Sequence, residues 1–380
     1  MNLDLTVLII LIFYLVIYIQ VIQFLDMQIS KLDEIYSLSS SLTCKEMISK
    51  INNYALQSQI ENMEPSKYID RFTGKAKNEL IINRSKCPLC NSQNFDFLFT
   101  KHGFDHALCN ECDLIFTLQI LDHEKIKFLV VGKEGDNYGD YKEDPVVSDH
   151  DKKKYEIVFE ELKKHTKINK IFDFGSNAGV FLDWCKLKNY SITGHEFHDA
   201  LRKGCVAKGH TVLNDNLETI QFDEVDLITC WDYIDHVLNP KAMIENLGKS
   251  LKKDGLFFFA INNRDSLSTR IMHERSPIFI GPHHTMHYGI NQLNLLMKDY
   301  ELLYSESYVS ELNWISNWLN FKNPEFGDSP LMKDLLPPKK ICELGMGFKV
   351  NAIYRKILLI LELLLKSTSI FLNHNSLFFP

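Results

Sequence analysis

The sequence predicts an α/β protein with a doubly wound, mostly parallel sheet, and three observations predict it. The apolar residues 171–174 are followed by a glycine-rich turn and by helical spacing over residues 180–187, which together predict the strand, turn and helix of a first βα unit. A second short strand, residues 191–196, ends in an acid. The fully apolar residues 256–261 are typical of a strand covered on both faces.

The composition describes a globular chain and excludes some partners. A length of 380 residues suggests two or three folding units. The net charge of −7 and pI of about 6.1 argue against a general nucleic-acid binder, so no nucleic-acid partner is expected. Nine cysteines, of which four form two Cys-x-x-Cys pairs, indicate a reducing compartment with one metal site.

The N-terminal segment predicts a membrane attachment. Residues 3–25 are almost wholly apolar, and 23 such residues can span a bilayer as a helix. We therefore divide the N-terminal part into a transmembrane helix at residues 1–26 and a helical linker at 27–84. A buried or partner-binding helix is the alternative, and a signal peptide fits poorly because no basic n-region precedes the apolar run.

Two cysteine knuckles, separated by 18 residues, predict a small zinc ribbon at residues 85–122. Four thiolates at this spacing can surround zinc tetrahedrally, and a site filled by four protein ligands is structural. His102 and His106 lie between the knuckles as less favoured ligands, and four unrelated buried cysteines are the other alternative. The predicted ligands are Cys87, Cys90, Cys109 and Cys112.

The glycine turn predicts a nucleoside ligand. Its spacing, Gly175-x-x-x-Gly179 after Asp173, differs from the Gly-x-Gly-x-x-Gly of pyrophosphate sites. It suits a ligand with a cationic amino-acid group and a nucleoside, such as S-adenosylmethionine. Glu196 lies 23 residues after Asp173, where an acid accepts ribose hydroxyls in nucleotide-binding folds; a solvated surface glutamate is the alternative.

The remaining elements complete the predicted sheet. We expect a helix at residues 152–164, a third strand at 211–213 and a fourth strand at 226–231. A helix at 240–251 and a turn at 253–255 then lead to the fifth strand. Residues 214–218 follow the third strand, where an adenine edge would be held. The predicted cofactor-binding residues are Asp173, Gly175, Ser176, Asn177, Gly179, Glu196, Asn216, Leu217, Cys230 and Trp231.

From about residue 87 to residue 304 the chain resembles class I S-adenosylmethionine-dependent methyltransferases that carry an N-terminal zinc ribbon. The resemblance rests on the two knuckles and on residues 173–179, 194–196, 231–236, 253–255, 262–263 and 282–284. It implies a seven-stranded Rossmann-like methyltransferase domain at residues 123–310. The chain departs from the family pattern at Asn177, Asp235 and Asn262; asparagine tolerates a left-handed backbone, so Asn177 need not break the loop.

The resemblance also implies roles for individual side chains. His236, just past the fourth strand, is the candidate general base, with Tyr233 and Asp235 orienting the substrate or the imidazole; capping of a helix is the alternative role of His236. A metal site at His283, His284 and His287 is a less favoured alternative to a substrate-side loop. The predicted substrate residues are Tyr138, Tyr141, Asn263, His283 and His284.

These features predict methyl transfer from S-adenosylmethionine to a small-molecule acceptor: a sugar, a nucleotide-sugar or a lipid-linked glycan precursor. A quinone or lipid O-methyltransferase and a non-catalytic binding or assembly protein are the alternatives, and a nucleic-acid methyltransferase is disfavoured by the acidic charge. We expect a membrane-anchored protein whose catalytic domain faces the cytosol, or otherwise a cytoplasmic one. Residues 311–380 are predicted to form a helical extension, with an amphipathic helix at 353–365.

Overall fold

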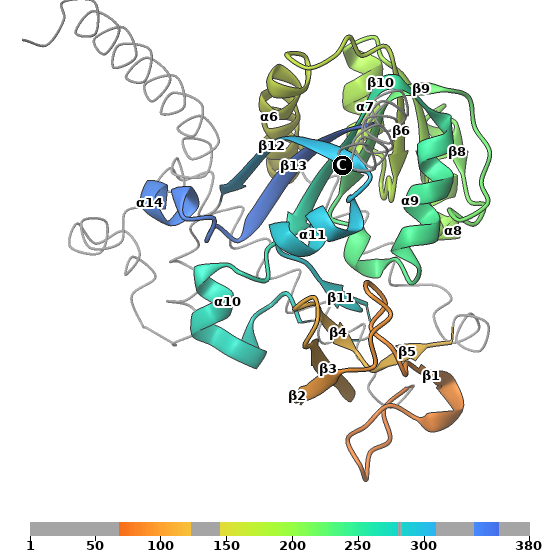
Figure 1. Cartoon of the computed structure of the whole chain (residues 1–380). Coiled ribbons are helices and arrows are strands. Elements are labelled where there is room, and N and C mark those ends of the chain that lie inside the picture. The colour runs from red at the N-terminus through yellow and green to blue at the C-terminus, as the bar shows by residue number, and fades with distance from the viewer. Residues whose placement is uncertain (1–67, 123–144, 280, 282, 309–337, 357–380) are drawn as a thin grey trace, which may run out of the picture.

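The computed structural model describes residues 68–122, 145–279, 281, 283–308 and 338–356 (Figure 1). The predicted membrane helix, Tyr138, Tyr141 and most of the predicted C-terminal extension lie outside this part of the chain. Within it, no helix is long and apolar enough to cross a bilayer.

The larger unit is built on a seven-stranded sheet with the order β12-β13-β10-β9-β6-β7-β8. The five strands from β10 to β8 are parallel, which confirms the predicted α/β fold. The sheet is nevertheless mixed, because β13 pairs antiparallel with both β10 and β12. The strands are β6 (Lys170–Phe174), β7 (Ser191–His195), β8 (Val212–Leu213), β9 (Val225–Trp231), β10 (Leu251–Asn262), β12 (Tyr300–Tyr308) and β13 (Lys349–Lys356).

Two local predictions are wrong. Residues 253–255 form no separate turn; they lie inside β10, where the pairing with β9 shifts register between Leu251 and Leu256. The predicted amphipathic helix at 353–365 begins with residues that belong to β13. These residues pair with both β10 and β12, and Ile353 and Tyr354 are buried. Sheet pairing therefore satisfies their backbone groups and overrides their helical spacing.

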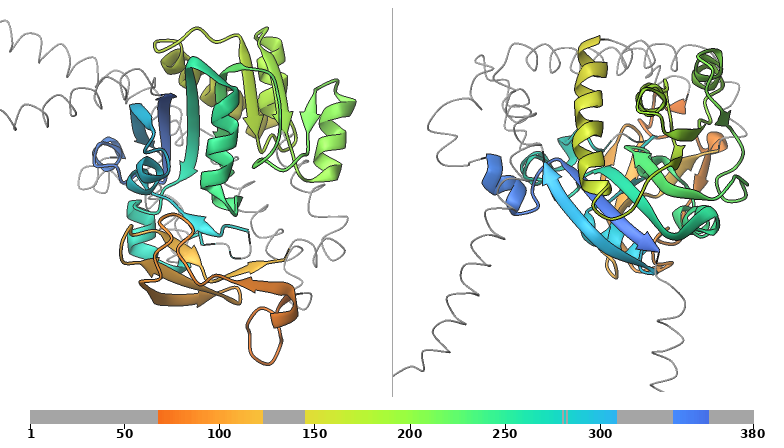
Figure 2. Two further views of the ribbon diagram at one scale, coloured as in Figure 1. Left: turned by 45° about the vertical axis from the view of Figure 1, so that its right-hand side comes forward. Right: turned by 90° about the horizontal axis from the view of Figure 1, so that it is seen from above.

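Helices cover both faces of the large sheet (Figure 2). On one face, α6 (Pro145–Leu162) and α7 (Val180–Leu187) pack on Leu256, Phe258 and Ala260 of β10. On the other, α9 (Pro240–Leu247) and α11 (Ile290–Leu296) pack on Phe257, Phe259 and Ile261. Successive side chains of a strand point to opposite faces, so burial on both sides explains why β10 is continuously apolar.

The remaining helical elements are short or lie at the rim of this unit. The helix α8 precedes the edge strand β8. The helix α10 is capped by Ser266, whose Oγ accepts a hydrogen bond from the Thr269 N–H at 3.2 Å. These elements are η2 (Asn78–Leu80), α8 (Asp199–Ala207), η3 (Ile234–His236), η4 (Gly248–Ser250), α10 (Leu267–Met272), η5 (His273–Arg275) and α14 (Pro338–Glu343).

The smaller unit is a four-stranded antiparallel sheet with the order β11-β4-β3-β2. It lies below the large sheet in Figure 1, with β2, β3 and β4 in gold and orange and β11 in teal. Its strands are β2 (Phe95–Lys101), β3 (Phe104–Cys109), β4 (Ile115–Thr117) and β11 (Met286–His287). Beside it, β1 (Ile81–Asn83) pairs with β5 (Gln119–Leu121). The end of the predicted helical linker, residues 68–84, therefore contains a 3₁₀ turn and a strand instead of an α-helix.

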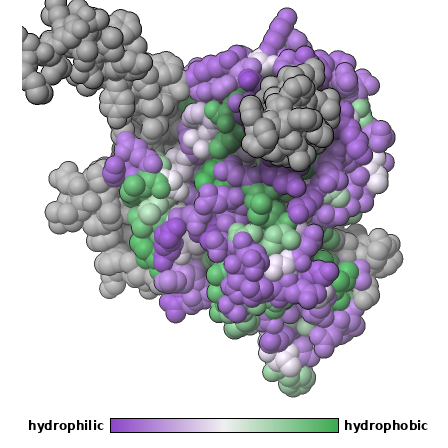
Figure 3. Space-filling model, in the orientation of Figure 1, coloured by the Kyte–Doolittle hydropathy of each residue, from purple (hydrophilic) through white to green (hydrophobic). Residues whose placement is uncertain are grey.

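The two units share one core. The apolar cluster that fills the α9–α11 face of the large sheet continues into Leu114, Phe116, Met286 and Tyr288 of the small sheet and its edge. Most of the described surface seen in Figure 3 is hydrophilic, with smaller apolar areas between. The small sheet is thus packed as part of the larger domain and is not an independent domain.

Candidate functional site

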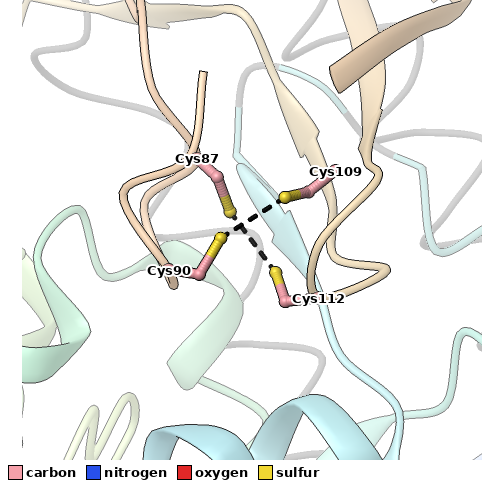
Figure 4. Close-up of side chains that lie close together, drawn as sticks. All are labelled: Cys87, Cys90, Cys109 and Cys112. Carbon is pink, nitrogen blue, oxygen red and sulfur yellow. Dashed lines mark hydrogen bonds between the residues drawn. The ribbon is translucent and has the colours of Figure 1, made fainter. Parts of the chain in front are cut away.

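The four predicted zinc ligands lie together (Figure 4). The sulfur atoms of Cys87 and Cys112 are 3.6 Å apart, and those of Cys90 and Cys109 are 3.4 Å apart. A zinc ion with Zn–S bonds of about 2.3 Å places its four sulfurs about 3.8 Å apart. All four thiols are free, so the donor set fits a single tetrahedral metal ion.

The intervening His106 does not join this cluster. Its ring stacks on Phe99 with 4.7 Å between ring centroids, and its Nδ1 lies 3.2 Å from the Phe104 carbonyl oxygen. The candidate metal-binding group therefore consists of sulfur ligands, as the knuckle spacing predicts.

The glycine turn at the end of β6 adopts the backbone that only glycine and asparagine accept readily. Gly175 and Gly179 have φ values of +80° and +82°, and Asn177 has a φ of 54°. Asn177 thus has the left-handed backbone that asparagine tolerates, and it does not break the turn. A Cβ on Gly175 would stand 2.4 Å from Cγ of Tyr233, so this ring lies directly against the turn.

Glu196 closes the turn from the neighbouring strand. Its carboxylate is buried; Oε2 accepts the Asn177 N–H at 2.8 Å, and Oε1 accepts the His198 N–H at 2.7 Å. Burial raises the pKa of Glu196, while these backbone hydrogen bonds oppose the rise. Each carboxylate oxygen has a further lone pair, so the group fits the predicted role of accepting ribose hydroxyls.

The Asp173 side chain is buried at the end of β6, where it interacts with Thr229 of β9 and with Ser176 of the glycine turn. Its carboxyl is 1% exposed and accepts the Thr229 hydroxyl at 2.7 Å, so it links β6 to β9. Burial raises the pKa of Asp173 to about 7. The predicted part of Asp173 in cofactor binding stays a prediction.

The raised pKa of Asp173 predicts a pH-dependent stability. Because the folded pKa of about 7 lies above the ordinary value of 3.8, the folded state retains a proton that the unfolded state has lost. The stabilisation of the folded state by this retained proton is fully present below pH 3.8 and is lost as the pH rises through about 7. We expect thermal unfolding from pH 4.5 to 8 to show a fall in the wild-type melting temperature that Asp173→Asn, a neutral isostere, lacks. Parallel curves for the two proteins would contradict this.

The other predicted cofactor residues divide into one exposed and three packed side chains. Asn216 is exposed, and its Oδ1 accepts the Glu218 N–H at 2.9 Å. Leu217 and Cys230 belong to the core of the large sheet, and Trp231 packs on Phe258 with ring centroids 4.5 Å apart. Among these four, Asn216 alone offers an exposed polar side chain for a base or ribose. Ser176 is buried, and its hydroxyl donates to the Asp173 carbonyl at 3.0 Å.

The residues after β9 connect the glycine turn to a histidine pair. The Tyr233 ring, which lies on Gly175, also stacks with the His236 ring at 5.5 Å between centroids. The His236 ring meets that of His284 edge-on at 4.8 Å. Burial lowers the pKa of His236 to about 4, so its imidazole is neutral at pH 7 and retains a lone pair that can accept a proton.

Asp235 lies between the two histidines. Its carboxylate oxygens are 3.8 Å from His236 Nε2 and 3.4 Å from His284 Nδ1, and it accepts the Asn262 amide at 3.3 Å. His284 Nδ1 also lies 2.9 Å from the Ile278 carbonyl oxygen, and a carbonyl can only accept, so this nitrogen carries the proton. The buried Asp235 therefore lies close to both rings, and its predicted role in orienting them stays a prediction.

The histidines that lie together in the structure differ from the three, His283, His284 and His287, that the sequence suggested as a less favoured metal site. His283 is exposed, whereas His287 is buried and stacks on His106 at 5.5 Å between centroids. The group that can converge on an ion consists of Asp235, His236 and His284, whose candidate ligand atoms lie within 4.8 Å of one another. Because His284 Nδ1 donates its proton to the Ile278 carbonyl, we interpret this group as a carboxylate that lies beside two imidazoles and not as a metal site.

Asn263 has a structural set of contacts. Its amide donates to the carbonyl oxygens of Gly345 and Gly347 at 2.9 and 2.7 Å, and its Oδ1 accepts the Asp265 N–H at 3.0 Å. Both amide hydrogens are thus used to tie the end of β10 to the segment before β13. We therefore assign Asn263 no substrate contact.

Several residues that shape the site were not identified from the sequence. Thr229 lies on a predicted strand but carries no motif, and Arg84 and Thr285 gave no signal at all. Asn262 belongs to a quoted motif, yet its contact with Asp235 depends on how β9 and β10 end side by side. Only the assembled sheet brings these groups together.

Comparison with known proteins agrees with this geometry. Residues 150–304 match a family model described as a methyltransferase domain. Proteins named ubiquinone biosynthesis O-methyltransferase are similar over short stretches. The one from Nitrosomonas europaea is 27% identical over 109 residues, covering 26% of this chain and 46% of the relative. The one from Coxiella burnetii is 29% identical over 105 residues, covering 25% and 44%. The chain thus spans less than half the length of these curated relatives.

Solved structures of similar shape include two methyltransferases. One is an S-adenosylmethionine-dependent methyltransferase from Archaeoglobus fulgidus, with a TM-score of 0.38, 16% identity, and coverage of 53% of this chain and 94% of that chain. The other is the plantazolicin methyltransferase BamL, with a TM-score of 0.41, 12% identity, and coverage of 61% and 94%.

Proposed function

We propose that this protein transfers a methyl group from S-adenosylmethionine to a small-molecule acceptor, because residues 150–304 match a family model described as a methyltransferase domain. One observation carries the proposal: at the ends of β6, β7 and β9, a left-handed glycine turn is closed by buried Glu196 on one side and by Tyr233 on the other. Ligands of doubly wound folds bind at this edge of the sheet.

The residues present fit the cofactor. The Glu196 carboxylate would accept ribose hydroxyls, and the glycine turn lets a ligand approach the backbone closely. The cofactor would supply an already activated methyl group, so the protein's part is alignment and, where the acceptor carries a proton, a base. Tyr233 touches both the turn and His236, which couples the position of the base to that of the cofactor site.

His236 is the proposed base. Its neutral ring can take the proton of an acceptor hydroxyl as the methyl group is transferred in line. Asp235 holds the neighbouring His284 and faces His236, so the carboxylate orients the rings and stabilises the imidazolium that forms. The acceptor would then lie between the Tyr233–His236 pair and His284.

Two acceptor classes have specific support. The curated relatives named for ubiquinone biosynthesis favour a phenolic hydroxyl of a lipid-like quinone precursor. The combination of cysteine knuckles with the methyltransferase motifs favours a sugar, nucleotide-sugar or lipid-linked glycan precursor. Membrane attachment through residues 3–25 would suit either lipid-linked acceptor and remains a prediction.

The test is a transfer assay with methyl-labelled S-adenosylmethionine and a panel of catechol-type quinone precursors and sugar nucleotides. We expect label in one of these classes with the wild-type protein. Label in neither class, together with tight binding of S-adenosylhomocysteine, would instead support the non-catalytic binding protein.

His236→Gln should separate chemistry from binding. The amide fills a similar volume but cannot accept a proton at neutral pH, so we expect turnover to fall about 10²- to 10⁴-fold, the usual contribution of a general base. The affinity for S-adenosylhomocysteine, measured by calorimetry, should stay within a few-fold of wild type. His273→Gln, at an exposed histidine to which no role is assigned, is the matched control. Equal turnover in His236→Gln and wild type would rule out the base role.

A further inference from the structure

The guanidinium of Arg84 lies between the small cysteine-bearing sheet and the segment that carries His284. Its Nη1 donates to the Thr117 carbonyl oxygen at 3.2 Å and to the Thr285 carbonyl oxygen at 3.1 Å. Its Nη2 donates to the Thr285 hydroxyl at 3.4 Å. One side chain thus holds the end of β4 and the residue next to His284 in a single hydrogen-bonded fork.

Thr285 connects Arg84 to the proposed catalytic residues through backbone hydrogen bonds. Its carbonyl oxygen also accepts the Thr117 N–H at 3.0 Å, and its own N–H donates to the Asp235 carbonyl oxygen at 2.9 Å. Thr117 and Thr285 are both buried, at 0% and 3% exposure. Thr285 is therefore the single residue between the small sheet and Asp235, and its backbone forms a hydrogen bond with each of them.

Further contacts of the described residues hold the chain on both sides of Thr285. Immediately after Thr285, β11 leaves the large domain and joins β4 as the edge strand of the small sheet. Before it, the His284 ring is held by the Ile278 carbonyl and by Asp235. The position of His284 thus depends on how the small sheet is seated.

Arginine suits this role for a chemical reason. Its planar fork can donate to two acceptors at once, which the single ammonium of lysine cannot do with the same geometry. Burial lowers the pKa of Arg84 to about 10, so the group stays charged at neutral pH and its hydrogen bonds remain charge-assisted.

We propose that Arg84 is a positioning residue: through Thr285 it fixes His284 against Asp235 and His236, so the cysteine-bearing sheet forms part of the acceptor side of the active site. The proposal rests on the proposed function for the meaning of His284 in methyl transfer. The positioning role goes beyond the proposed function because it gives the small sheet a part in the active site in addition to any part in stability.

The structure provides a matched control. Lys101 also ties the small sheet to the larger domain, since its Nζ donates to the Ser276 carbonyl oxygen at 2.8 Å. That contact does not involve Thr285 or Asp235. A variant at Lys101 therefore weakens the seating of the same sheet without cutting the link to His284.

The experiment is NMR of the full-length, metal-loaded protein with ¹³Cε1-labelled histidine and bound S-adenosylhomocysteine. Spectra of His284→Gln and His236→Gln identify the two ring signals among the 14 histidines of the chain. We expect both signals to shift or broaden in Arg84→Gln and Arg84→Lys and to stay in place in Lys101→Met. The affinity for S-adenosylhomocysteine should remain within about twofold of wild type in all three, because the hydrogen bonds of Arg84 go to Thr117 and Thr285 and not to the glycine turn.

Unshifted signals in a folded Arg84→Lys protein would overturn the proposal, and so would equal shifts in Lys101→Met, because Arg84 would then only dock the sheet. The lysine variant keeps the test decisive if Arg84→Gln fails to fold. Failure of the proposed function would show differently, as absence of S-adenosylhomocysteine binding or of methyl transfer in the wild-type protein.

Discussion

Replacing Glu196 with glutamine is expected to weaken S-adenosylmethionine and S-adenosylhomocysteine binding by about 100-fold or more. Hydrogen bonds to a charged group contribute about 1.5–3 kcal/mol each, and two ribose hydroxyls would lose such an acceptor. The amide NH₂ would also face one of the two N–H groups, of Asn177 or His198, that the carboxylate now accepts. The glycine turn would therefore lose part of its own support.

Calorimetric titration measures the affinity, and thermal unfolding without ligand separates a binding defect from loss of fold. Asp199→Asn is the matched control, because Asp199 is an acid only three residues away but is exposed and pairs with Arg202 and Lys203. Undiminished affinity in a folded Glu196→Gln protein would remove the ribose role and with it the strongest support for the cofactor site.

The second large effect is expected at the cysteine cluster. We propose that it holds one structural Zn²⁺. The Cys112→Ser variant, or wild-type protein treated with a strong chelator, should therefore contain no zinc. The small sheet should then unfold, because structural zinc supplies much of the folding free energy of such small units. Because the two units share one core, unfolding of the small sheet would also affect the larger unit. Met286 and Tyr288, which pack in the same apolar cluster as Leu293 of α11, would lose their contacts with the small sheet.

Elemental analysis should find one zinc per wild-type chain and none in Cys112→Ser, with a lower melting temperature in the variant. Cys342→Ala is the control, since this buried cysteine lies outside the cluster and its loss should leave the zinc content at one. A metal-free wild-type protein with an unchanged melting temperature would show that the four thiols pack as ordinary buried side chains.

Much of the cofactor side was predictable because its signals are local. The turn at Gly175–Gly179, the left-handed Asn177 and the acid at the end of β7 follow from spacing and backbone preference within one βα unit and the next strand. The cysteine knuckles are equally local, and their sulfurs lie together as their spacing predicts. Such patterns depend on conformations of neighbouring residues, which a sequence expresses directly.

Other assignments required the assembled sheet. The inward position of Asp173 results from its pairing with Thr229, 56 residues away, and the amide of Asn263 is used by carbonyls more than 80 residues away. The insertion of antiparallel β13 between β10 and β12 depends likewise on strands distant in the chain. Periodicity reports which face of an element is apolar, but it does not report which element will cover that face.

The sequence by itself determined the α/β class, the glycine turn with its acid, and the grouping of the four cysteines. The tertiary structure alone decided that His284, Asp235 and His236 converge and that Arg84 reaches Thr285 across 201 positions of the chain. The physical reason is that a buried polar group must find a partner wherever the fold provides one. That partner is chosen by packing in three dimensions, for which a single sequence carries no local signal.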